Sequence, residues 1–478
     1  MKKPLKSPVL FSSIWPISSK SLTYEILSKM PERELWQLKR AIYKREFARS
    51  GSHAFAKRKI RELRLKLHPY SAPKKMPLVV KASRYKECHI LDSLVPKRER
   101  LWTTPIKRVK SGTHEISNFS LIDNPEETFG NLKKIAQAEC AELEATLNFQ
   151  DEKVIDIGAF LVLRVMHERM LPFIRGGKMN ESVKKVIEAV GLREGMRIVR
   201  FTNTDMSDVF PFPLHQRLPP EKGHFRNIAL EPSTREKASD NLVNTINKWL
   251  SNLDEPEQLT KEGCGFVTGL LGEVLNNAER HSNLDYRMNG NWYTAGFMAK
   301  RRIDPNGPKS DTNAKYVCHL AFLSVGKTIS ETIQTADENI VEAMAGYVNL
   351  HRNKHLSEES LRTVYALQDG ISRTSQSDDS SINGVGMLDI VDLVNELSND
   401  GENGNAALTI VSGKTCIILK DKYRSFDWGD DNKRRQFLNE QNDINQPPDP
   451  DCIVELKQKF PGVVISVRFE LEQTKNVA

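Results

Sequence analysis

The stretch LLGEVLNNAERHS, residues 270–282, combines the spacing of a helix with side chains that could do chemistry. Glu273, Asn277 and His281 recur every four residues, so they share one helix face. The Asn carboxamide oxygen is a hard ligand that suits Mg²⁺, and a carboxylate one turn away can accept a proton from a water. The apolar residues between them indicate a second face directed at a core. The alternative interpretation is a surface helix with a polar stripe.

The composition limits the classes of protein that can position such a helix. Of the 478 residues, 39% are hydrophobic, and no apolar run approaches the roughly eighteen residues of a membrane helix. The first twenty residues do not predict a signal peptide. The six cysteines are scattered without a CxxC pair, which argues against a disulfide framework or a zinc site and predicts a cytoplasmic protein.

The charge is divided unequally along the chain. Residues 1–110 hold 28 Lys and Arg against 8 Asp and Glu, a net +20, so the remainder carries −12 of the overall +8. Residues 31–51 and 53–69 both have helical spacing, and the second carries the dense basic run AKRKIRELRLKL. Such a segment favours nucleic-acid phosphates, while an acidic protein partner or the chain's own acidic body stays open as the alternative.

The middle of the chain alternates expected helices and strands. Residues 129–147 are expected to be helical, and EKVIDIGAFLVLRVMHERM to be a buried strand that leads into a helix. ESVKKVIEAVGL, residues 181–192, is amphipathic, and RIVRF, 197–201, is expected to be a strand. The prolines between 211 and 232 indicate a linker. A hairpin is expected from WYTAGFMAKRR and KYVCHLAFLSVG.

Three later segments follow the polar helix in the sequence. They are SVGKTI at 324–329, INGVGMLDIVDLV at 382–394, and FPGVVISVRFEL at 460–471. Together with the polar helix they resemble the boxes of the GHKL ATPases, the family of gyrase and the histidine kinases. The resemblance makes Glu273 the catalytic base or water-positioning carboxylate and Asn277 the Mg²⁺ ligand, and it places His281 at the helix end. It implies ATP and Mg²⁺ as cofactors.

The glycines of the resemblance fall on the phosphate side. Gly384 and Gly386 match the second glycine box, where only a residue without a side chain lets the backbone come close to phosphates. The helix expected to begin at Met387 would direct its N–H groups at them. The resemblance also implies a lid at about 338–384 that orders around the phosphates.

The base-recognition side departs from the family pattern. Ser324 stands where the family has an Asp, followed by Gly326 and Thr328, and Gly462–Val463 stands where the family has Gly-Thr. A hydroxyl is a weaker acceptor than a carboxylate. Ser412 and Thr415 are candidates to compensate. We therefore expect weak or altered adenine recognition beside an intact metal and phosphate side.

The middle segment is similar to the second half of a STAS domain, in its strand and its two helices. In the phosphorylated members of that family a Ser follows the strand's Asp, whereas Ile157 follows Asp156 here. His167 and the residues after it also resemble the phosphoacceptor box of histidine kinases, but Met170 and Leu171 replace the usual Arg and Thr.

The expected fold class is α/β, with a basic helical region at 1–112, a STAS-like α/β domain with a Pro-rich linker at 113–235, and a Bergerat-type α/β sandwich with a mixed sheet at 236–478. The expected function is a cytoplasmic, bacterial GHKL-type ATPase or switch that couples Mg-nucleotide state to a partner or nucleic acid. A non-catalytic interaction module with a degenerate GHKL fold and a histidine or serine kinase are the alternatives. No membrane partner is expected, and a homodimer stays open.

Overall fold

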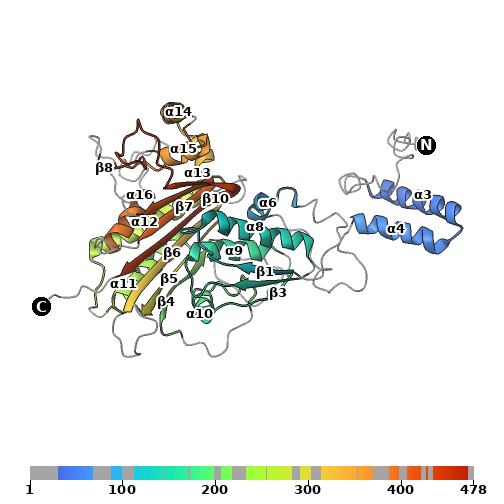
Figure 1. The fold of residues 1–478 in the computed structure, drawn as a ribbon, viewed down its shortest axis with the longest axis horizontal. Coiled ribbons are helices and arrows are strands. Elements are labelled where there is room, and N and C mark those ends of the chain that lie inside the picture. The colour runs from blue at the N-terminus through green and yellow to red at the C-terminus, as the bar shows by residue number, and fades with distance from the viewer. Residues whose placement is uncertain are drawn as a thin grey trace, which may run out of the picture.

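The computed structural model describes most of the chain between residues 31 and 471 (Figure 1). The described residues are 31–67, 88–98, 112–142, 144–170, 173–198, 206–217, 233–253, 256–281, 291–302, 314–352, 354–368, 371, 387–397, 406–420, 427–428 and 434–471. They form a mixed α/β protein with one antiparallel and one parallel sheet. No helix among them is long and apolar enough to cross a membrane.

A five-stranded sheet forms the centre, in the order β4–β5–β6–β10–β7, with every neighbouring pair antiparallel. The expected hairpin of β5 and β6 is confirmed. The expectation of a mixed sheet in the C-terminal part was wrong, because the parallel pairs belong to a separate sheet. The strands are β4 (Val209–Gln216), β5 (Asn291–Arg302), β6 (Ala314–Val325), β7 (Ala407–Lys420) and β10 (Ile453–Leu471).

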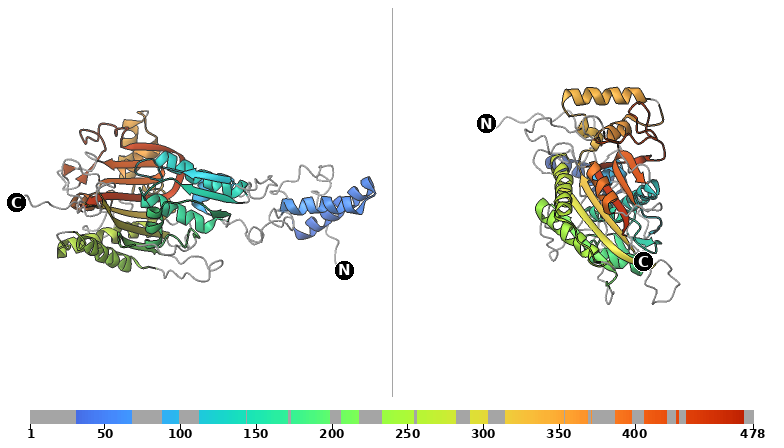
Figure 2. Two further views of the ribbon diagram at one scale, coloured as in Figure 1. Left: turned by 60° about the horizontal axis from the view of Figure 1, so that its bottom comes forward. Right: turned by 90° about the vertical axis from the view of Figure 1, so that its left-hand side faces the viewer.

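Three helices cover one face of this sheet, and the right-hand view of Figure 2 shows helices lying along that face. Alternate residues of each strand point to this face, for example Cys318, Leu320 and Phe322 of β6. They meet the apolar side of the helices in one buried cluster that includes Trp249 and Leu271. The helices are α11 (Arg235–Leu250), α12 (Lys261–His281) and α16 (Met387–Leu397).

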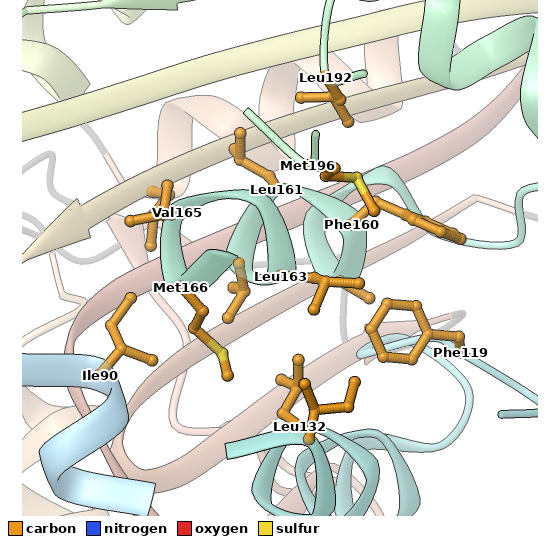
Figure 3. Packing of buried hydrophobic residues seen from close by; sticks show 14 of the residues in the cluster. Ile90, Phe119, Leu132, Phe160, Leu161, Leu163, Val165, Met166, Leu192 and Met196 are labelled. Atoms are coloured by element: carbon orange, nitrogen blue, oxygen red, sulfur yellow. The ribbon is translucent and has the colours of Figure 1, made fainter. Parts of the chain in front are cut away.

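The opposite face carries the parallel three-stranded sheet, in the order β1–β2–β3, and its helices. Helix α9 is buried on all sides from Ile157 to His167, as its mostly apolar sequence requires. Figure 3 shows Phe160 and Met166 of α9 among Phe119 and Leu132. The elements are α6 (His89–Leu94), β1 (Gly112–Ile116), α8 (Pro125–Ala141), β2 (Ala145–Phe149), α9 (Ile157–Arg169), β3 (Ile174–Gly176) and α10 (Glu181–Ala189).

Two of the prolines expected to mark a linker lie in a strand instead, and the other three, Pro219, Pro220 and Pro232, lie outside the described residues. Pro211 and Pro213 lie within β4, which pairs with β5. Proline lacks an N–H donor, and β4 tolerates it because it is an edge strand. One strand of the five-stranded sheet therefore comes from sequence before the expected boundary at 235.

Two expected elements of the middle segment were also wrong. Residues 145–149 form β2, although the helix now seen as α8 was expected to continue to residue 147. The strand expected at EKVIDI is absent, because residues 152–156 form a loop between β2 and α9 and Ile157 begins α9. Arg197 and Ile198 are not in a strand, and the rest of RIVRF lies outside the described residues. The helices α9 and α10 are confirmed.

The basic N-terminal segment contains two contacting helices, α3 (Glu32–Ser50) and α4 (His53–Leu67). Gly51 ends α3 in the left-handed conformation, as expected. Leu38, Ile42 and Leu63 are buried between the helices. Phe55, an aromatic residue of α4, is 38% exposed.

The expected lid region at about 338–384 holds α14 (Glu338–His351) and α15 (Glu358–Tyr365), which share a small apolar cluster with Phe437 and with α13 (Ile329–Ile333), just before that region. Residues 372–386 lie outside the described parts of the chain. A short ladder, β8 (Asp427–Trp428) with β9 (Arg434–Arg435), lies between β7 and β10 in the sequence.

Candidate functional site

Helix α12 divides its sequence between a core face and a polar face. Leu271 and Leu275 are buried against the five-stranded sheet. Glu273, Asn277 and Glu279 are half-buried, so their polar groups lie at the edge of the core. The helix thus holds a carboxylate and a carboxamide one turn apart, as its spacing predicted.

A hydrogen bond fixes the end of α12 to the sheet. The Nε1 of Trp292 on β5 donates to Oε1 of Glu279 at 2.9 Å. Arg217, at the end of β4, pairs with the same carboxylate at 3.3 Å. Trp292 lies directly opposite Ser324 in the β5–β6 ladder. The last turns of α12 are therefore held at the end of the sheet where β6 terminates.

Glu273 lies in an environment that favours its protonated form. Burial raises the pKa of its carboxyl, and Asp389 on α16 raises it further. Arg280, Arg235 and a hydrogen bond with Asn276 act in the opposite direction but do not cancel the effect of burial. A carboxyl whose pKa is raised towards neutrality is better suited to exchange protons with a substrate or a water.

Helix α16 begins at Met387, as expected, and contacts α12. Its first turns are fixed by Arg434 of β9, which is buried and pairs with Asp389 at 2.6 Å and with Asp392. Gly384 and Gly386, which immediately precede the helix in the sequence, lie outside the described residues. The helix start is thus brought to α12, while the glycine pair is not described.

Ser324 lies at the end of β6 on the helix-covered face, because it follows Leu320 and Phe322 in the strand alternation. Ser324 is 8% exposed, and its cross-strand partner on β10 is Val463. The altered residues of the base-recognition side, Ser324 and Val463, are therefore direct neighbours in the sheet.

Gly462 makes the close approach that its residue type permits. Its φ of +113° favours glycine, and a Cβ there would overlap the backbone carbonyl of Ser324. The N–H of Gly326 reaches the Pro461 carbonyl at 3.4 Å. These contacts draw the end of β6 against the bulged part of β10, where the ladder with β7 changes register.

Ser412 has a role that the sequence did not reveal. Its hydroxyl accepts from the Ile329 N–H at 2.8 Å and donates to the Gly462 carbonyl at 3.2 Å. Thr328 caps α13 in a reciprocal pair with Glu331. Ser412 and Thr328 therefore hold the backbone beneath this end of the sheet. Only the positions of Ser412 and Thr328 relative to Gly462 could have indicated this role. In the folded chain those positions depend on the register shift between β7 and β10.

Thr415, the other candidate to compensate, lies elsewhere. Its hydroxyl is 3.1 Å from that of Ser360 on α15, and Ser360 also donates to Glu455 at 2.8 Å. This network ties α15 to the strands β7 and β10. Thr415 is therefore part of the attachment of the helical region 329–365 to the sheet.

Two histidines singled out in the sequence stand apart from this arrangement. His281 is the last residue of α12, and its side chain lies outside what the structure describes. His167 is buried within α9, where Nδ1 lies 3.2 Å from the Gly195 carbonyl and burial lowers the pKa to about 4. A phosphoacceptor must be reached by nucleotide, and this ring is enclosed by the core.

Within the described ranges, no group of three or more His, Cys, Asp and Glu side chains could hold a metal ion. A site with a single protein ligand such as Asn277 suits Mg²⁺, which keeps several waters and takes its other ligands from substrate phosphates. The donor set of α12 therefore fits Mg²⁺ that arrives with a nucleotide better than a resident metal.

Comparisons with protein-family models, with curated proteins and with solved structures found no match. The arrangement of α12, β6, β10 and α16 is therefore the basis for the function proposed below.

Proposed function

We propose that the chain binds a magnesium–nucleotide complex, with ATP as the first candidate, as a GHKL-type regulatory ATPase or switch. The observation that carries the proposal is the meeting of three distant segments at one end of the sheet. These are α12 with Glu273 and Asn277, the β6–β10 junction with Ser324 and Gly462, and the start of α16.

Each segment has a distinct task in this proposal. Asn277 supplies one oxygen ligand to Mg²⁺, and Glu273 positions or deprotonates the attacking water. The N-terminal N–H groups of α16 face the phosphates, because a helix N-terminus attracts anions. The metal ion would neutralise phosphate charge when bound. Ser324 lies where the base would be recognised.

Base recognition is the part in which this chain differs most from the family it resembles. Ser324 is a neutral acceptor, and hydrogen bonds to neutral acceptors are about half as strong as charge-assisted ones. Ser412 is already engaged with Ile329 and Gly462. We therefore propose that the chain discriminates weakly between ATP and GTP and derives its affinity from the phosphates and Mg²⁺.

The test is a titration of the full chain with ATP and with GTP, each with and without Mg²⁺. We expect binding that needs Mg²⁺, and we expect Asn277→Ala to abolish that Mg²⁺-dependent binding because a methyl group offers no ligand. Asn244→Ala, on the exposed side of α11, is the matched control and should bind as the wild type does. Unchanged affinity in Asn277→Ala would remove the metal role of α12.

The second candidate function is a non-catalytic module that binds nucleotide, or only a partner, without turnover. The altered base-recognition residues favour it. Release of inorganic phosphate from ATP under conditions of saturating Mg²⁺ distinguishes the two candidates. Binding without phosphate release would assign the chain to the second.

The basic N-terminal segment has a separate proposed task. In the described range 31–67 the positive side chains greatly outnumber the negative ones on α3 and α4. We propose that this surface binds nucleic-acid phosphates, with an acidic protein as the alternative partner.

A further inference from the structure

A second polar region lies on the other face of the five-stranded sheet, at the carboxyl ends of β1 and β2. Because these strands are parallel, the loops that follow them meet at one edge. Asp151 accepts from the N–H groups of Asn118 at 2.8 Å and Phe119 at 3.0 Å. Buried Asp156 accepts from Leu121 at 2.6 Å. The two loops are thus joined into one platform, and such edges are where α/β folds bind ligands.

Strands β5 and β10 direct two arginines to this platform. Arg301 donates to the carbonyl of Val154 in the β2–α9 loop at 3.0 Å. Arg468 forms two hydrogen bonds with Asp123 in the β1–α8 loop, at 2.6 and 3.1 Å. Both guanidinium groups therefore lie beside the loops and not beside α12.

Lys153 completes what we call the basic cluster, namely Lys153, Arg301 and Arg468. Partial burial lowers the pKa of Lys153, and the charges of Arg301 and Arg468 lower it further, against smaller opposing effects of Glu470 and Glu152. Burial and Arg468 lower the pKa of Arg301 to about 10. The three cations therefore repel one another. The nearby carboxylates offset this repulsion only in part, because Asp123 also accepts from Lys420 and Glu470 accepts from Lys315.

Beside the basic cluster lies a buried histidine whose ring nitrogens lack hydrogen-bond partners among the described residues. His319 lies beside Arg468 in the β6–β10 ladder, is 1% exposed, and stacks on Phe297. Neither ring nitrogen has a hydrogen-bond partner among the described residues. Burial and the neighbouring cations keep its pKa well below the ordinary value, so the ring stays neutral. A neutral ring carries no negative charge, so His319 does not reduce the repulsion among the three cations.

We propose that the basic cluster is an oxyanion site that binds a phosphate group, either as inorganic phosphate or as the end of a small phosphomonoester. A phosphate dianion between Lys153, Arg301 and Arg468 would replace repulsion by attraction, and charge-assisted hydrogen bonds to guanidinium are among the strongest in proteins. The site is open to solvent, since Lys153 is exposed and the side chain of Arg468 is 22% exposed.

This site is independent of the proposed nucleotide site. The side chains of β5, β6 and β10 alternate between the two faces, and Ala299 and Ala321 on the face of the basic cluster belong to the core around α9. Glu273 and Asn277 lie on α12, on the opposite face. Loss of one site should therefore leave the other intact.

The test measures binding of inorganic phosphate to the full chain by calorimetry, and by the rise in Tm relative to chloride at equal ionic strength. We expect saturable binding in the wild type, weakened at least tenfold in Lys153→Gln and in Arg301→Gln. Lys248→Gln, an exposed lysine on α11, is the matched control and should bind normally. In chloride, Lys153→Gln should have a Tm no lower than the wild type, because burial, Arg301 and Arg468 disfavour the charge of Lys153 more than Glu470 and Glu152 favour it.

Two further arms keep the outcome unambiguous. Asn277→Ala should retain phosphate binding, and if it alone abolishes binding, the anion occupies the proposed nucleotide site and the present proposal fails. Glycerol phosphate compared with inorganic phosphate identifies which source binds more tightly. Absence of saturable binding, or equal binding in Lys153→Gln and Lys248→Gln, would overturn the proposal. Since Lys153 is exposed, its variant carries the test even if Arg301→Gln fails to fold.

Discussion

At the scale of single residues, Glu273 combines partial burial with a raised pKa beside the proposed Mg²⁺ ligand. If the chain hydrolyses nucleotide, Glu273→Gln should bind it with wild-type affinity and release phosphate about a hundredfold more slowly, because general-base assistance is lost. Phosphate release at saturating Mg-ATP measures this. Glu262→Gln, exposed in the first turn of the same helix, is the control. Wild-type turnover in Glu273→Gln would place the base elsewhere.

Buried histidines give the protein a dependence on pH of definite sign. Burial lowers the pKa of His167 and of His215 to about 4. A histidine of the unfolded chain has a pKa of about 6.5, so below that pH the unfolded chain binds more protons than the folded one. Stability should therefore be full above pH 6.5 and fall as the pH drops towards 4, by at most about 1.4 kcal/mol per pH unit for each histidine.

Urea unfolding at pH 7.5, 6 and 5 checks this dependence. His167→Gln should flatten the loss of stability in this range, since glutamine does not titrate. His89→Gln, exposed on α6, should leave the slope unchanged. Equal slopes in the wild type and in His167→Gln would show that this ring is not buried as a neutral group.

At the scale of elements, the junction of β6 and β10 depends on one glycine. Gly462→Ala should destabilise the protein by at least about 1–3 kcal/mol from backbone strain, and more from overlap with the Ser324 carbonyl. Thermal or urea unfolding measures this. Gly346→Ala, in the interior of α14 with no atom near the added carbon, should instead stabilise by about 0.5–1 kcal/mol. A neutral Gly462→Ala would mean that the strands can separate at little cost.

Patterns carried by one element were predictable, and those set by pairing were not. The hairpin of β5 and β6 and the start of α16 follow from local apolar spacing and turn residues. Strand β2 was missed because AECAELEATL consists mainly of helix-forming residues, and its state is decided by the parallel neighbours β1 and β3. Proline tolerance in β4 likewise depends on its being an edge, which only the sheet reveals.

The residues of the candidate site divide in the same way, into those that a local sequence pattern reveals and those that only distant contacts define. The polar face of α12 could be read from a four-residue period, and Gly462 from its segment. The tasks of Ser412 and Glu279 depend on contacts with residues far away in the sequence, Gly462 and Trp292. No local spacing encodes such contacts, so these residues had no sequence signal of their own.

At the scale of the whole molecule, the charge division leads to a prediction about the N-terminal arm. Neutralising five cations of α4 should weaken nucleic-acid binding equally across sequences, and flatten its salt dependence by up to about 0.9 log units per lost phosphate contact. Filter binding at several salt concentrations measures this. The five are Arg58, Lys59, Arg61, Arg64 and Lys66.

The matched control for that variant neutralises five exposed lysines of the acidic body, and it should retain the wild-type salt slope. These are Lys134, Lys248, Lys261, Lys414 and Lys457. If the wild type shows no salt-sensitive binding to DNA or RNA at low ionic strength, an acidic protein becomes the better partner for the arm.

The origin of β4 ahead of residue 235 decides how this chain can be dissected. A recombinant fragment of residues 236–478 would leave β5 as an exposed edge strand. Its unpaired N–H and C=O groups could then pair with a second molecule. The fragment would also lack α9, so Phe297 and Leu323 of the sheet would be exposed to water. Such a fragment should precipitate. A cut between Leu67 and Cys88 would instead release α3 and α4 and keep both sheets together with α6, whose Ile90, Leu91 and Leu94 belong to the same core, so it offers the better starting point for expression and crystallisation.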